Sequence, residues 1–92
     1  MPAGRRPRGD ATIRGALRRH FEALLAVQER AARLGAPYST AETRRRIALI
    51  DEGAPVIVSQ WELEEAFGHL GIQASLADRR YIVSADGDYG PA

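Results

Sequence analysis

The chain has 92 residues, among them 13 arginines, no lysine, 12 acidic residues and no cysteine. Its length allows one small domain, and the lack of cysteine excludes disulfides, thiolate-bound zinc and thiol nucleophiles. Apolar runs such as Ala54–Val58 are far shorter than the ~20 residues of a membrane span. No apolar stretch follows the basic N-terminus, as it would in a signal peptide. We therefore expect a cytoplasmic protein that does not enter the membrane.

Charge is divided unevenly along the chain. Residues 1–50 contain 11 arginines and four acidic residues, whereas residues 51–92 contain two arginines and eight acidic residues. This asymmetry favours an acidic partner for the first half, such as DNA, or contact between the basic half of one copy and the acidic half of another. Both interpretations stay open at this point.

Residues 1–9 are predicted to be a flexible basic arm, because arginines alternate there with glycine and proline. Asp10 or Thr12 can cap the helix that follows, and Gly35 with Pro37 ends it. Its apolar positions recur every 3.5 residues. The stripe predicts burial in a helical bundle or across a homo-oligomer interface. To that interface we assign Ile13, Leu17, His20, Leu24, Val27 and Leu34.

Two shorter helices are predicted next, each from a capping box, in which a serine and a glutamate three residues later satisfy the first backbone amides. Ser39 and Glu42 predict a helix over Thr40–Asp51, followed by a short strand, Val56–Val58. Ser59 and Glu62 predict the third helix. Further signals for that helix are a hydrophobic staple between Val58 and Leu63 and a left-handed Gly71 at its end.

Two alternatives are open after Gly71. Ser75 can cap a short helix to about Tyr81, or Tyr81–Val83 can form a strand that pairs with Val56–Val58. Residues 84–92 are rich in turn-forming residues and are predicted to be a flexible tail. The predicted fold class is therefore mainly α. It is a single small domain over residues 10–83, with a long amphipathic helix and a minimal strand or strand pair.

Catalysis and metal binding have no support in the sequence. His20 and His69 fall on different predicted helices, without the spacing of a metal site. Ser39, Ser59 and Ser75 are explained as helix caps. We expect no enzyme and no cofactor.

The arginines point instead to nucleic acid. The segment Arg6–Gly9 reads RPRG and resembles the start of an AT-hook, a motif that lays arginine into the minor groove of DNA. Arg44–Arg46 place three more cations on the second helix. These residues and the arm are candidates for phosphate contact.

Residues 44–75 read RRRIALIDEGAPVIVSQWELEEAFGHLGIQAS. The order of helix, short strand, helix and Gly-Ile turn resembles the winged helix-turn-helix domain of bacterial arginine repressors, and helix-turn-helix regulators generally. The resemblance implies that Ser59–Leu70 is the positioning helix and that Gly71-Ile72 is the turn. It places a recognition segment at Ser75–Tyr81. The implied DNA-contacting residues are Gln73, Ser75, Arg79 and Arg80.

We therefore predict a small non-catalytic DNA-binding regulator. Its nucleic-acid contacts would come from the helix-turn-helix-like segment and from Arg5, Arg6, Arg8, Arg44, Arg45 and Arg46. The alternative is a protein-interaction or assembly subunit, for example of a phage or other particle, which would then lie within a virion. In that alternative the acidic residues Glu62, Glu64 and Glu65 of one copy receive the basic arm of another.

Overall fold

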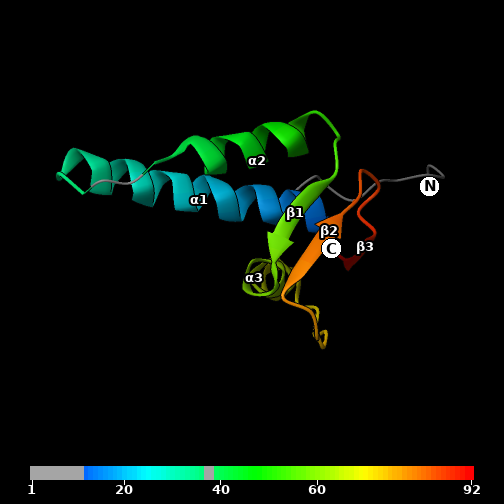
Figure 1. The fold of residues 1–92 in the computed structure, drawn as a ribbon. Coiled ribbons are helices and arrows are strands. Elements are labelled where there is room, and N and C mark those ends of the chain that lie inside the picture. Colours follow the sequence, from blue (N-terminus) through cyan, green and yellow to red (C-terminus); the bar gives the residue numbers. More distant parts are fainter. Residues whose placement is uncertain (1–11, 37–38) are drawn as a thin grey trace, which may run out of the picture.

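The computed structural model describes residues 12–36 and 39–92, and the predicted arm with Arg5, Arg6 and Arg8 lies outside them. Three helices dominate the described chain, as predicted, and a three-stranded antiparallel sheet joins them (Figure 1). The elements are α1 (Ile13–Arg33), α2 (Ala41–Asp51), β1 (Val56–Ser59), α3 (Gln60–Leu70), β2 (Arg80–Val83) and β3 (Tyr89–Pro91). No helix within the described residues is long and apolar enough to span a membrane.

Helix α1 begins after one of the two caps that the sequence predicts. Thr12 is its N-cap, and the Thr12 hydroxyl accepts a hydrogen bond of 2.9 Å from the amide of Gly15. Helix α2 runs back beside α1, so that the two form a helical hairpin whose closed end projects away from the sheet (Figure 1). The base of the hairpin packs against the sheet and α3, which places α2 close to β1.

Helix α2 has nearly the predicted bounds, but the predicted capping box is wrong. Thr40, not Ser39, is the N-cap, and its side chain caps no amide. Ser39 receives only a long hydrogen bond, 3.4 Å, from the amide of Ala41. The Glu42 carboxylate lies instead within 3.4 Å of the Arg46 guanidinium. The strong local cation draws the glutamate away from the helix start.

Helix α3 confirms its predicted signals. The Ser59 hydroxyl accepts from the Glu62 amide at 3.3 Å, and the Glu62 carboxylate accepts from the Ser59 amide at 2.8 Å. Gly71 has a φ of 69°, and the amide of Ile72 donates to the Phe67 carbonyl at 2.9 Å. This pattern is a Schellman motif, which satisfies the last carbonyls of the helix.

The predicted short helix at Ser75–Tyr81 is wrong, and the strand alternative is confirmed. Residues 72–79 contain no helix, and β2 pairs with β1 so that Val56 faces Val83 and Val58 faces Tyr81. Leu76 is buried in the core, and its carbonyl accepts from the Gln60 side-chain amide at 2.5 Å. Side chains therefore hold this segment in an irregular conformation, and a helical ladder does not form.

The predicted loop over residues 84–92 is corrected as well, because Tyr89–Pro91 form strand β3 and pair with β2. Gly87, with a φ of 91°, makes the turn between the two strands, and the Ser84 amide donates to the Asp88 carbonyl at 2.8 Å. The Tyr89 ring lies edge-on against Phe67. This aromatic contact stabilises the packing of β3 against α3.

The core lies between the sheet, α1 and α3. Its fully buried large side chains are Leu17, Phe21, Val56, Val58, Leu63 and Val83. Alternation along the strands turns Val56, Val58, Tyr81 and Val83 inward and leaves Ile57, Arg80 and Ile82 on the outer face of the sheet.

Candidate functional site

All three consecutive arginines of α2 form ion pairs within the chain, and those of Arg44 and Arg46 are the shortest. Arg44 lies 2.5 Å from the Glu29 carboxylate of α1. Arg46 donates two hydrogen bonds, of 2.9 and 3.2 Å, to the buried carboxylate of Glu62. Arg45 is different, because its nearest carboxylate, that of Glu42, is 3.7 Å away and both side chains are exposed. Of the three, Arg45 is the residue most free to meet a partner.

The opposite charges of the two sequence halves meet inside a single chain. Arg18 binds Asp51 through two hydrogen bonds of 2.6 and 3.0 Å, and Arg46 binds Glu62 as described above. The Arg18 guanidinium holds the pKa of Asp51 below its usual value, mainly through these hydrogen bonds. Part of the charge asymmetry in the sequence therefore serves to join α1 and α2 to each other and α2 to α3.

Arg14 is a structural residue that the sequence interpretation missed. Its side chain is buried and donates to the carbonyls of Leu49, Ile50 and Ala54 and to those of Val83 and Ser84, at 2.7 to 3.3 Å. It thereby ties the end of α2 to the end of β2. The helical period could have identified it, because Arg14 shares a face with Leu17 and Phe21. Burial lowers its pKa.

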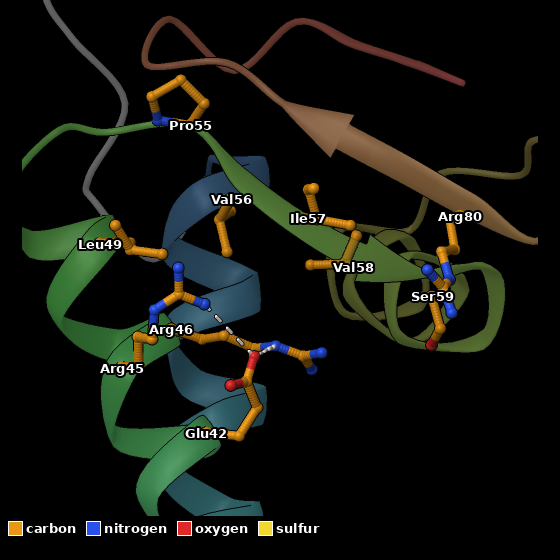
Figure 2. Close-up of a pocket in the computed structure, with 10 residues that line it drawn as sticks. All are labelled: Glu42, Arg45, Arg46, Leu49, Pro55, Val56, Ile57, Val58, Ser59 and Arg80. Atoms are coloured by element: carbon orange, nitrogen blue, oxygen red, sulfur yellow. Dashed lines mark ion pairs between the residues drawn. The ribbon is translucent and has the colours of Figure 1, made fainter. Parts of the chain in front are cut away.

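A groove of about 590 Å³ lies between α2 and β1. Figure 2 shows β1 running between α2 on one side and β2 on the other, so the groove follows the side of β1 that β2 does not cover. Its charged lining is Glu42, Arg45, Arg46 and Arg80, and its apolar lining includes Leu49, Pro55 and Ile57. We call this feature the α2–β1 groove. It combines an apolar floor with two exposed guanidinium groups.

The register of the sheet shows which backbone groups face the groove. The amide of Gln60 donates to the Arg79 carbonyl, so even-numbered residues of β1 point their backbone groups toward β2. The amide and carbonyl of Ile57 and the carbonyl of Pro55 consequently point toward the groove. The next amide on that side, that of Ser59, is already bound to Glu62. The uncovered edge is short and leaves one donor and two acceptors without a partner among residues 12–36 and 39–92.

The opposite edge of the sheet is less open to pairing. The Ala92 amide donates to the Arg80 carbonyl, so Tyr89 and Pro91 turn their backbone groups away from β2. Pro91 has no amide hydrogen to donate. The proline therefore blunts the β3 edge, whereas the β1 edge keeps a donor between two acceptors.

The predicted DNA-contacting residues are not gathered on one element. Gln73, Ser75 and Arg79 are exposed in the irregular segment 72–79, in which Leu76 is buried. Arg80 is exposed on β2 and lines the α2–β1 groove. The structure therefore brings Arg80 together with Arg45 and Arg46 at the groove, which Gln73, Ser75 and Arg79 do not line.

The predicted oligomer stripe divides between the core and the surface. Leu17 is fully buried, and Ile13 and Leu24 pack against the same core, so their contacts are made within one chain. Val27 and Leu34 are 65% and 81% exposed and lie toward the projecting end of the helical hairpin. These two remain accessible to a second copy.

His20, the other member of the stripe, lies between two aromatic rings. Its ring meets Phe21 and Trp61 edge-on, with centroids 5.3 and 5.2 Å away. Its Nε2 is buried and has no hydrogen-bond partner within the described part of the chain. Burial lowers the pKa of His20 below 6.5, more than the charges of Glu62 and Glu65 raise it. The structure favours neutral histidine here.

The described residues contain no cluster of three or more histidine, aspartate or glutamate side chains that could hold a metal ion. The α2–β1 groove is thus the feature with the chemistry best suited to recognition. Comparison of the chain with protein-family models, with curated proteins and with solved structures gives no match.

Proposed function

We propose that the chain is a non-catalytic protein-interaction module that binds its partner at the α2–β1 groove. The observation that carries the proposal is the uncovered edge of β1 beside two exposed isoleucines. Ile57 and Ile82 face each other across β1 and β2 and are 51% and 38% exposed. An uncovered strand edge with neighbouring apolar side chains is a template for pairing with another chain.

Charge also favours a protein partner for the described domain. Residues 12–36 and 39–92 contain ten arginines and eleven acidic side chains, so they carry no basic excess. Two of the arginines predicted to contact phosphate, Arg44 and Arg46, are neutralised by carboxylates of the same chain. Phosphate binding depends on a concentrated positive surface, which these pairs reduce.

A DNA-binding regulator is the second proposal, and the exposed Arg79 and Arg80 support it. The two proposals differ in the groups they use. DNA binding would depend on the arginines and fall steeply with salt, because each neutralised phosphate releases counterions. Protein binding at the groove would depend on Ile57 as well.

Selection from a random peptide library on the immobilised full-length chain tests the first proposal, with titration of a labelled duplex DNA in parallel. We expect the chain to select peptides that do not bind the Ile57→Asp variant and still bind the Ile72→Asp variant. Ile72 is a matched control, because it is 46% exposed and does not line the groove. Saturable, salt-sensitive binding of DNA that is equal in both variants, with no peptide selected, would overturn the proposal.

A further inference from the structure

The α2–β1 groove also indicates the chemical class of its partner. We propose that it binds an extended segment of another protein that carries acidic side chains and adds as a fourth strand to the edge of β1. This inference rests on the proposed function, and it specifies how the partner is recognised.

The backbone supplies the first part of the recognition. The Ile57 amide can donate to the added strand, and the carbonyls of Ile57 and Pro55 can accept from it. The pairing ends at Ser59, because the Ser59 amide is held by the Glu62 carboxylate at 2.8 Å. About three main-chain hydrogen bonds are therefore open to the partner. So few bonds cannot hold a peptide firmly in water, and side-chain contacts must add to them.

The side chains around the groove supply the second part. The free apolar surface is Ile57 with Pro55, which suits a β-branched or aliphatic side chain on the added strand. Arg45 and Arg80 line the same groove from α2 and β2 (Figure 2). Glu42 offsets only part of this charge, because it is shared between Arg45 at 3.7 Å and Arg46 at 3.4 Å. A carboxylate on the partner would pair with the positive charge of Arg45 and Arg80 that Glu42 does not neutralise.

Charge also selects among the occupants that this chain could itself supply. Residues 1–9 carry three arginines and no acidic residue, so the basic arm is repelled by Arg45 and Arg80. Two β1 edges paired across a two-fold axis would bring like guanidinium groups together. An acidic segment of a different protein meets neither obstacle.

A labelled six-residue peptide that alternates valine and glutamate is the probe, with fluorescence anisotropy as the readout. We expect the glutamine version to bind about five-fold more weakly and the lysine version more weakly still, since exposed ion pairs each contribute up to about that factor. Arg45→Gln and Arg80→Gln should each weaken binding of the glutamate peptide by a few-fold. Arg79→Gln is the matched control, because Arg79 is exposed beside Arg80 but does not line the groove.

Two N-methylated isomers of the same peptide test strand addition on the unaltered chain. One isomer carries methyl groups on the valine amides and the other on the glutamate amides. Only amides of one parity face β1 in an added strand, so one isomer should bind at least ten-fold more weakly than the other. Equal binding of both isomers, or equal binding of the glutamate and glutamine peptides, would overturn the inference.

These results are distinguishable from failure of the proposed function. Peptides selected from the library without acidic residues would overturn the acidic partner and leave the interaction module standing. A dimer that forms without peptide and is lost in Ile57→Asp would assign the β1 edge to a second copy and overturn the inference. If duplex DNA displaced the peptide from wild type and not from Arg80→Gln, the groove would be assigned to nucleic acid. That result would also overturn the inference.

Discussion

Replacement of Arg14 by methionine should destabilise the fold by about 3 kcal/mol. Methionine keeps the aliphatic stem and removes five hydrogen bonds to carbonyls. The loss is smaller than five full bonds because other amides already serve several of these acceptors. Ala54 donates to the Leu49 carbonyl, and Gly53 donates to that of Ile50.

The Ser84 carbonyl also keeps a donor, the amide of Gly87. The Val83 carbonyl still accepts a hydrogen bond from β1 in the antiparallel pairing of β1 with β2. The Ala54 carbonyl loses its 2.7 Å hydrogen bond from Arg14, and no backbone amide of the described residues donates to it in turn. A part-buried acceptor without a donor costs about 1–3 kcal/mol, and loss of the charge-assisted bonds adds to this. Removal of a buried cation offsets some of the total, which gives the figure of about 3 kcal/mol.

Thermal unfolding followed by circular dichroism measures this effect. In a domain of this size, a loss of 3 kcal/mol lowers the Tm by about 15 °C. Arg30→Met is the matched control, because Arg30 is exposed on the same helix, and its Tm should stay within about 2 °C of wild type. If Arg14→Met and Arg30→Met melted together, the hydrogen bonds of Arg14 would not be holding α2 to β2.

Two further predictions concern a cap and a buried histidine. Ser59→Ala should lower the free energy of unfolding by about 1 kcal/mol, because Ser59 forms a complete capping box. Ser39→Ala should lower it by only a few tenths of a kcal/mol. Equal losses in chemical denaturation would contradict the assigned helix starts. His20 has a folded pKa below its unfolded value of 6.5, so the unfolded chain binds the extra proton first and stability should fall as the pH drops below 6.5. His20→Phe should remove that part of the pH dependence and His69→Gln should keep it, as measured by urea unfolding at pH 5 and pH 7.5; an unchanged dependence in His20→Phe would refute the assignment.

The sequence predicted the features that depend on neighbouring residues. The Ser59 capping box, the Schellman motif at Gly71 and the cap of α1 at Thr12, one of two expected there, each involve groups within a few residues of one another. The capping box at Ser39 failed because Glu42 is drawn to Arg46, a contact that the local pattern did not weigh. Local signals therefore predict helix ends well unless a charged neighbour competes for the capping side chain.

The features that the sequence did not predict depend on distant residues. Residues 72–79 form no helix because Leu76 enters a core made by other elements, and Gln60 binds the Leu76 carbonyl. The α2–β1 groove needs the pairing of β1 with β2, which leaves one edge of β1 uncovered. Arg45 and Arg80 are 35 positions apart in sequence and share the groove only in the fold. Spacing along the chain could not show that they act together.

Amide hydrogen exchange at Ile57 tests the central proposal most directly. In the free chain the Ile57 amide points to the groove and should exchange much faster than the amides of Val56 and Val58, which point to β2. Saturation with the valine–glutamate peptide should slow exchange at Ile57. The exchange rates of residues toward the projecting end of the α1–α2 hairpin, such as Val27, should stay unchanged. Protection of Ile57 in the free chain, or exchange at Ile57 that the bound peptide does not slow, would contradict the account.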